Sequence, residues 1–204
     1  KINYLHWKLW SYISVNSYDI YRVYIFQKKS KIFQMKKAYG IVGWSGSGKT
    51  SLTCRIISHF TKKKIKVASI KHSHHNFQVD KEGKDSFKHA KAGSNEVIIY
   101  NEYKFAMISS LQKKSISLRS MISKFSKDTE IILVEGLKHS TLKKLEVYRA
   151  DLNKPILCND DKRITCLVYD KKFEGFEKIK IPKFQFNETL KICDFLQKEF
   201  KNEK

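Results

Sequence analysis

The chain has 204 residues, a mass of 24.0 kDa, and a composition that is 41% hydrophobic and 30% charged. This composition is globular rather than disordered or fibrous, and the length suits one α/β domain that needs no disulfide or metal staple. The net charge of +21 comes mostly from lysines spread along the whole chain, with only five arginines, so we do not expect nucleic-acid binding as the function.

Residues 1–34 mix aromatic residues and lysines without a clear period. They contain no A-x-A cleavage site and no clean apolar segment, so we expect no secretory signal. Met35 and two lysines precede the first convincing strand. We therefore predict an N-terminal extension of unclear role over 1–34 and a working domain over 35–204. The alternative for the first segment is an amphipathic arm that binds a partner or a membrane surface.

From residue 38 onward, short apolar runs alternate with longer stretches of helical period, which predicts βα units around a mostly parallel sheet. The two runs around Asn101 and Glu102 are expected to form a hairpin at a sheet edge. The expected strands are 38–42, 66–70, 96–100, 104–109, 131–135, 144–149 and 164–169. The expected helices are 49–62, 84–92, 117–125 and 187–200. No run of about 18 uncharged apolar residues occurs, so we expect no membrane span.

Residues 43–50, G-W-S-G-S-G-K-T, fit the pattern G-x-x-x-x-G-K-[ST] between a strand and a helix. Glycines allow backbone N–H groups to converge on phosphate oxygens, and the following helix adds its positive end. Lys49 is expected to bridge the β- and γ-phosphates, and the Thr50 hydroxyl to bind Mg²⁺. The alternative is a glycine-rich turn that happens to precede a helix. The predicted phosphate-binding residues are Gly43, Ser45, Gly46, Ser47, Gly48, Lys49, Thr50 and Ser51.

The motif extends the fold prediction to a P-loop nucleoside triphosphate hydrolase fold, a mostly parallel sheet flanked by helices. A second half of the site is expected where the apolar run 131–135 ends in Glu135 and Gly136. Ligands of open α/β sheets collect at the carboxyl ends of strands, so Glu135 is expected beside the phosphates. It would hold Mg²⁺ through water or orient the attacking water. The alternative is a surface glutamate that ends a strand.

Residues 70–86 contain three histidines within four positions and two aspartates. This segment leaves the strand expected next to the P-loop strand, so its basic side chains are predicted to reach phosphate or a phosphorylated partner ligand. The basic candidates are Lys71, His72, His74 and His75. Asp80 or Asp85 is predicted to serve Mg²⁺, although Asp85 and Ser86 also suit the start of a helix. Zinc is the weaker alternative, because no cysteine or fourth ligand lies at zinc spacing.

Cysteine usage indicates the compartment. The four cysteines are scattered, lie mostly inside apolar runs and form no C-x-x-C pair. We interpret them as buried thiols in a reducing cytosol, which predicts a cytoplasmic protein.

Three segments together resemble the MobB family: G-W-S-G-S-G-K-T-S-L, the run from Ile70 to Ser94, and I-I-L-V-E-G-L-K-H. The resemblance implies GTP with Mg²⁺, weak hydrolysis, a homodimer, and association with the MobA-type nucleotidyltransferase that joins GMP to molybdopterin, with molybdopterin itself a possible ligand. Family roles carry over to Gly46, Gly48, Lys49, Thr50, Glu135 and Gly136. The chain has no N-K-x-D motif, so a preference for guanine rests on the resemblance alone. Asp170 is a candidate reader of guanine, with a turn-forming aspartate as the alternative.

The predicted function is a GTP-binding adapter in molybdenum cofactor biosynthesis, with Lys49 and Glu135 supporting a weak GTPase. The alternative is a small-molecule kinase with the same P-loop. A kinase is expected to carry a mobile, arginine-bearing lid, and residues 104–128 contain only Arg119.

Overall fold

The computed structural model describes residues 37–73, 77–111 and 115–202, which belong to the compact unit Lys36–Lys204. The division of the chain into an extension over 1–34 and a domain over 35–204 depends on residues outside this description. That division therefore stays a prediction.

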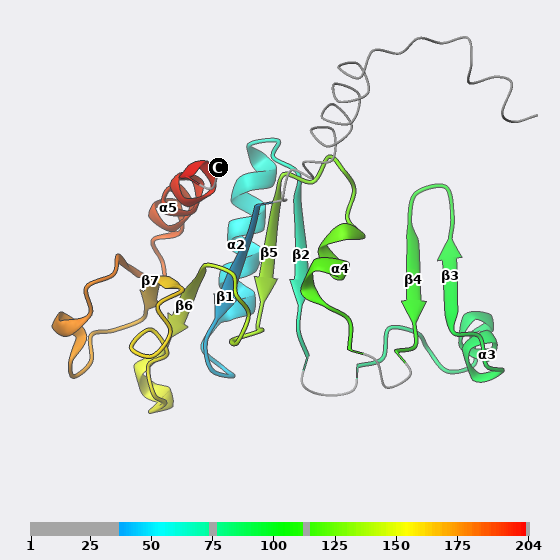
Figure 1. Cartoon of the computed structure of the whole chain (residues 1–204), viewed down its shortest axis with the longest axis horizontal. Helices are drawn as coiled ribbons and strands as arrows, with labels where there is room; N and C mark the ends of the chain where they lie inside the picture. Colours follow the sequence, from blue (N-terminus) through cyan, green and yellow to red (C-terminus); the bar gives the residue numbers. More distant parts are fainter. Residues whose placement is uncertain (1–36, 74–76, 112–114, 203–204) are drawn as a thin grey trace, which may run out of the picture. The chain divides into compact units, whose positions relative to one another are not determined.

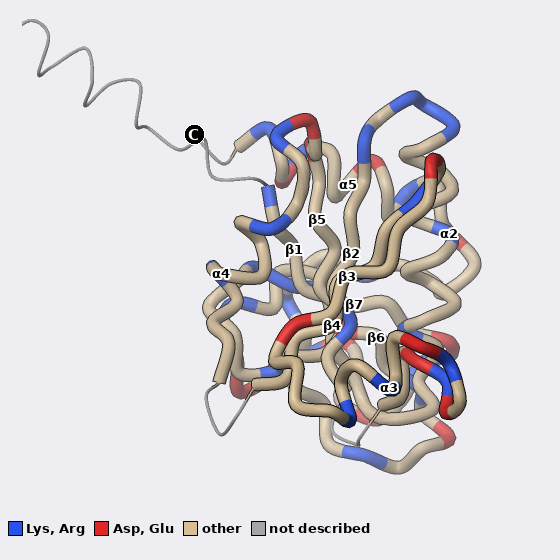
Figure 2. The backbone as a smooth tube through the Cα atoms, turned by 90° about the vertical axis from the view of Figure 1, so that its right-hand side faces the viewer, with Lys and Arg blue, Asp and Glu red and all other residues tan. Residues whose placement is uncertain are grey.

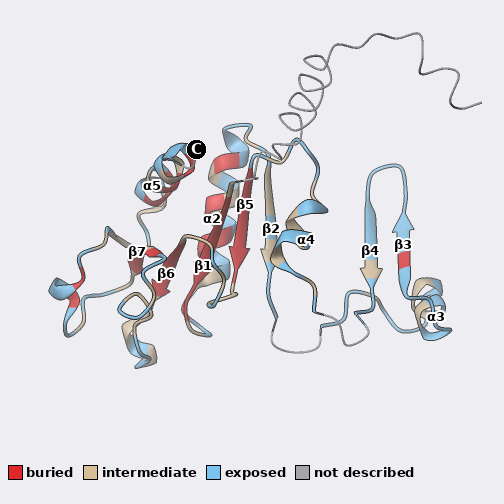
Figure 3. Cartoon of the chain, viewed as in Figure 1, coloured by how far each residue is buried: buried red, intermediate tan, exposed pale blue. Residues whose placement is uncertain are grey.

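Six parallel strands form the main sheet in the order β2-β5-β1-β6-β7-β8 (Figure 1). Their bounds are β1 Lys37–Val42, β2 Val67–Lys71, β5 Ile131–Glu135, β6 Lys144–Tyr148, β7 Ile164–Tyr169 and β8 Lys183–Gln185. The central strands are almost continuously buried (Figure 3), as expected for strands covered on both faces. Because all six strands run in the same direction, their carboxyl ends meet at one edge, where the P-loop follows β1.

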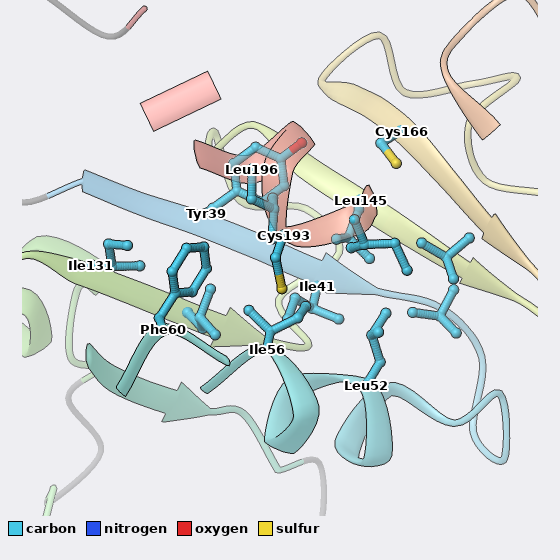
Figure 4. Close-up of a cluster of buried hydrophobic side chains, with 14 of the residues drawn as sticks. Tyr39, Ile41, Leu52, Ile56, Phe60, Ile131, Leu145, Cys166, Cys193 and Leu196 are labelled. Atoms are coloured by element: carbon cyan, nitrogen blue, oxygen red, sulfur yellow. The ribbon is translucent and has the colours of Figure 1, made fainter. Parts of the chain in front are cut away.

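The two faces of the sheet are covered by different helices. Alternate β1 residues such as Tyr39 and Ile41 pack against α2 (Lys49–Lys62) and α5 (Thr189–Asn202), as Figure 4 shows. Ala38 faces the other side, in the cluster that includes side chains of α4 (Leu118–Ser123). The period of two along the strands and the 3.6-residue period of the helices therefore produce two separate core layers.

The predicted hairpin forms, but its predicted place at a sheet edge is wrong. Strands β3 (Glu96–Tyr100) and β4 (Phe105–Ser109) pair antiparallel in a two-stranded sheet of their own. The edge strands of the main sheet are β2 and β8. A short turn brings two adjacent strands together locally, whereas nothing in the local pattern specifies a second neighbour for either of them.

The other predicted elements are confirmed with small shifts in their ends, and so is the predicted fold class. Helix α2 has the predicted bounds, and α3 spans Asp85–Lys91. Three short elements were not predicted: the three-residue strand β8 and two 3-10 helices, Ala150–Leu152 and Phe176–Lys178. Lysine and arginine residues occur along most of the described chain (Figure 2).

The described residues include no helix long and apolar enough to cross a membrane. All four cysteines are free thiols, and Cys166 and Cys193 are buried as expected. Burial in the core raises the pKa of both thiols, in addition to smaller effects of nearby charges. The prediction is wrong for Cys54, which is exposed because its position on α2 faces away from the sheet.

Candidate functional site

The P-loop depends on glycines where other residues would clash. Gly43 has φ 148°, and an added Cβ would lie 2.3 Å from the carbonyl oxygen of Val147. Gly48 has φ 94° and is the N-cap residue of α2, so the helix begins on a left-handed residue. The turn therefore brings bare backbone to the start of a 14-residue helix, an arrangement that attracts anions.

Lys49 folds back over this turn, and its Nζ donates a hydrogen bond of 2.7 Å to the carbonyl oxygen of Trp44. Burial is the main cause that lowers the pKa of Lys49, and the charges of Lys138 and Lys71 lower it further against the opposing effect of Glu135. The hydroxyl of Ser47 is buried and has no hydrogen-bond partner among the described residues. The loop thus offers a hydrogen-bond donor, the Ser47 hydroxyl, and a positive charge, the Lys49 ammonium. A bound anion would pair with both.

Thr50, Glu135 and Lys71 meet beside the loop. The hydroxyl of Thr50 donates a 2.7 Å hydrogen bond to Oε1 of Glu135. Lys71 Nζ lies 2.5 Å from the same oxygen and 3.0 Å from the Thr50 hydroxyl. The Glu135 side chain is only 8% exposed, so its carboxylate is nearly buried beside these two partners. The prediction that Glu135 lies beside the P-loop is therefore confirmed.

Strand register explains this meeting. Lys71 at the end of β2 lies opposite Glu135 at the end of β5, which also lies opposite Ile41 of β1. The prediction that β2 neighbours the P-loop strand is therefore wrong, because β5 lies between β2 and β1 and strands that follow each other in the chain need not be neighbours in the sheet. The N–H of Gly136 donates to the carbonyl oxygen of Ile41, so Gly136 serves the site through its left-handed conformation (φ 92°) rather than through a free donor. A hydroxyl and a carboxylate are hard oxygen ligands of the kind that Mg²⁺ prefers, and these residues fit that metal. The ammonium of Lys71 lies at the point where both oxygens converge.

The remaining predicted residues lie at different distances from this centre. Ser45 and Gly46 are exposed on the loop, and Ser51 is exposed in the first turn of α2. The N–H of His72 donates to the carbonyl oxygen of Glu135, which places this residue at the site, while His74 and His75 lie outside the described residues.

Asp80 and Asp170 are held by other parts of the chain. Asp80 lines a hollow shared with α3 and β3, and its Oδ1 accepts the N–H of Lys81. No contact in the described part of the chain joins it to Thr50 or Glu135, so a metal role for Asp80 stays a prediction. Oδ1 of Asp170 accepts the N–H groups of Ala150 and Lys171, as a turn-forming aspartate would.

Sequence reasoning missed the side chains that hold the loop after β6. Trp44 Nε1 donates a 2.6 Å hydrogen bond to the carbonyl oxygen of Pro155, and Lys138 Nζ lies 3.4 Å from the centre of its ring. Glu146 is fully buried and accepts the N–H groups of Leu157 and Cys158. Burial raises the pKa of Glu146 despite these hydrogen bonds. The sequence K-L-E-V-Y-R contained a usable signal for these residues. It places a carboxylate inside an apolar strand and an arginine at the end of that strand.

Comparisons with known proteins identify the family of the chain. Residues 38–170 match the family model MobB, "Molybdopterin guanine dinucleotide synthesis protein B". The chain is 42% identical over 118 residues, 57% of its length, to a "Molybdopterin-guanine dinucleotide biosynthesis adapter protein" of Haemophilus influenzae. It is 34% identical over 108 residues, 52% of its length, to the protein of the same description from Escherichia coli. It spans 66% and 62% of those relatives, somewhat less than two thirds of each.

Solved structures show the same fold. A crystal structure described as molybdopterin-guanine biosynthesis protein B aligns with a TM-score of 0.60 at 22% identity, covering 81% of this chain and 99% of that one. The structure of Bacillus subtilis MobB aligns with a TM-score of 0.61 at 21% identity, covering 82% and 99%. The family model covers most of the chain and includes the P-loop, Glu135 and Asp170, and the chain therefore belongs to the MobB family.

Proposed function

We propose that this chain binds GTP with Mg²⁺ on residues 43–50, hydrolyses it slowly, and acts as an adapter in the biosynthesis of molybdopterin guanine dinucleotide. The observation that carries the proposal is the convergence of Thr50 and Glu135, 2.7 Å apart, beside Lys49 and the glycine turn. The names of the curated relatives describe adapter proteins of that biosynthesis. Free cysteine thiols support a cytoplasmic location.

In this proposal the backbone N–H groups of the loop and the ammonium of Lys49 bind phosphate oxygens. Thr50 and Glu135 would hold the magnesium, directly or through water, and the metal would supply positive charge that stabilises the phosphate groups. Lys71 leaves the two oxygens and reaches toward phosphate, and His72 and His74 lie on the same segment. Asp170 reads guanine with the carboxylate oxygen that does not hold the turn.

A binding titration of the full chain with GTP and with ATP, each with and without Mg²⁺, tests the proposal. We expect Mg²⁺-dependent GTP binding, at least tenfold weaker ATP binding, which corresponds to about 1.4 kcal/mol, and slow release of labelled phosphate to water. Labelled phosphate on an added small-molecule acceptor would favour the kinase alternative. If neither nucleotide bound, the assignment of the loop would be wrong.

The adapter role needs a partner. We propose a MobA-type nucleotidyltransferase, with molybdopterin as a further ligand near the segment that follows β2. The exposed residues Lys71 and His72 beside the site support this choice, because a partner docked there would lie next to a nucleotide bound on the loop. GTP-dependent co-elution of the two proteins is the expected result, and co-elution that ignores nucleotide would contradict it.

The β3–β4 hairpin supports the homodimer implied by the family resemblance. On one face of the hairpin, Ile98 pairs with Met107 and Tyr100 with Phe105. Their exposed fractions are 59%, 42%, 81% and 76% in that order, which is unusual for four adjacent large apolar side chains. Val97 faces the other side and is buried, and α3 contacts strand β3. We propose that this apolar face of the hairpin packs against a second copy of the chain.

Replacing Ile98 with glutamate is expected to convert the dimer to a monomer, because a charge would be buried between apolar surfaces. Light scattering coupled to gel filtration measures the mass. Lys104→Glu, in the turn of the same hairpin, is the matched control and is expected to stay dimeric. A parent protein that runs as a monomer would rule out the homodimer.

A further inference from the structure

The side of the P-loop away from Glu135 is built by the carboxyl ends of β6, β7 and β8. Arg149 follows β6, Asp170 follows β7 and Phe186 follows β8. The N–H of Phe186 donates to the carbonyl oxygen of Tyr169 at 2.7 Å, and Asp170 accepts the N–H of Ala150 at 3.1 Å. These hydrogen bonds connect the ends of β6, β7 and β8, which together form one wall beside the P-loop.

Two side chains of this wall reach the P-loop itself. The position where Gly48 would carry a Cβ lies 2.9 Å from Cζ of Phe186 and 3.5 Å from Nη2 of Arg149. Both groups therefore lie against the N-cap residue of α2, within the proposed phosphate-binding loop. The arginine also lies over the phenyl ring, with its guanidinium carbon 5.5 Å from the ring centre.

Arg149 has hydrogen-bonding capacity that the described residues do not use. Its Nε is buried and has no hydrogen-bond partner in the described part of the chain. No ion pair between Arg149 and a carboxylate occurs among residues 37–73, 77–111 and 115–202. A partly buried guanidinium without an oxygen partner is costly, and phosphate oxygens are the acceptors that match its planar donors.

Arg55 on the same ring behaves differently. Its guanidinium carbon is 4.4 Å from the ring centre of Phe186, and its Nη2 donates a 2.5 Å hydrogen bond to the carbonyl oxygen of that residue. Although the Nε of Arg55 also lacks a partner, this arginine is committed to the backbone after β8. Arg55 therefore holds Phe186 in place, and Arg149 lies over the same ring.

The strand order indicates which part of a nucleotide would meet Arg149. Thr50, Glu135 and Lys71 mark the metal and the terminal phosphate on the β5 and β2 side of β1. The nucleoside end must then leave toward β6, β7 and β8 on the other side. Resting on the proposed function, we propose that Arg149 binds the α-phosphate of the nucleotide, with Phe186 as the platform that positions its guanidinium.

The test compares ligands that differ in their phosphates. For Arg149→Met we expect affinity for GTP and for GDP to fall by the same factor, about 10- to 100-fold, because both carry an α-phosphate. Affinity for inorganic pyrophosphate is expected to stay unchanged, because it would occupy the β and γ positions. Arg149→Lys is expected to show an intermediate loss, since an ammonium cannot supply the planar fork.

Arg119→Met, an exposed position on α4, is the matched control, and melting curves without nucleotide verify that each variant folds. If Arg149→Met weakened GTP but not GDP, the arginine would serve the terminal phosphate and the inference would be overturned. Unchanged affinity for both would overturn it as well. A parent that binds neither nucleotide would instead refute the proposed function, from which the α-phosphate was inferred.

Discussion

Replacing Lys49 with alanine is expected to weaken GTP binding about a hundredfold and to leave the melting temperature without nucleotide within about 2 °C of the parent. Losing charge-assisted hydrogen bonds to two phosphates costs about 3 kcal/mol. Among the described residues the ammonium makes one hydrogen bond, to the carbonyl oxygen of Trp44, and partial burial lowers its pKa. Removing it therefore takes away one contact and one poorly solvated charge, and these effects offset each other.

Calorimetric titration and a thermal melt of the same sample separate the two quantities. Lys62→Ala, at the exposed far end of the same helix, removes an equal charge away from the loop and should bind GTP like the parent. Parent-like affinity in Lys49→Ala would end the assignment of the loop. A large fall in melting temperature would show that Lys49 acts in folding.

Replacing Lys144 with methionine is expected to lower the free energy of unfolding by about 3 kcal/mol, which corresponds to roughly 10 °C in melting temperature. Lys144 lies on β6 and is completely buried. Its Nζ donates to the carbonyl oxygens of Lys138 and Ser140 and to Oδ2 of Asp161, at 2.7, 2.8 and 2.7 Å. Methionine would leave all three acceptors without this donor, although Asp161 keeps Arg163.

Denaturant unfolding measures this loss, and Lys143→Met is the neighbouring control. Lys143 forms a partly exposed pair with Glu199, so its removal is expected to cost less than about 1 kcal/mol. A Lys144→Met variant as stable as the parent would mean that the buried ammonium contributes no net stability, as happens when desolvation cancels the attraction.

The same network should respond to acid. Partial burial opposes ionisation of Asp161, but hydrogen bonds from Lys144 and Arg163 outweigh it and lower the pKa from 3.8 to about 2. The unfolded chain therefore binds more protons between these two values. The stabilisation is complete above pH about 4 and is lost as the pH falls toward 2, so the difference between the parent and Lys144→Met should narrow over that range.

Much of the fold follows from local sequence patterns. Continuous apolar runs such as 131–135 predicted buried parallel strands, and the glycine spacing predicted the loop and the start of α2. Glu135 could be predicted because ligands of such sheets bind at the carboxyl ends of the strands, and Glu135 is the last residue of an apolar strand. The three-residue strand β8 was not predicted, because its sequence K-F-Q contains no apolar run. The separate sheet formed by the hairpin was not predicted, because the sequence pattern of two strands does not specify whether a third strand pairs with them.

The missed parts of the site share one physical cause. Arg149 and Phe186 are 37 positions apart in the sequence and meet at Gly48 only because three parallel strands end together. Glu146 and Lys144 are charged residues inside a strand, where a pattern predicts apolar ones, and their burial is possible only because distant loops supply partners. Local spacing carries no information about such long-range contacts.

Lys71 has a consequence for the order in which ligands arrive. Its tethered ammonium already neutralises Glu135 and sits between the two oxygens suited to a divalent ion. A free divalent cation would have to displace the Lys71 ammonium without compensation. A cation bound to a polyphosphate brings phosphate oxygens with which the displaced ammonium can pair. The metal and the nucleotide are therefore expected to bind together. Displacement of Lys71 would then couple occupancy of the P-loop to the segment that follows β2.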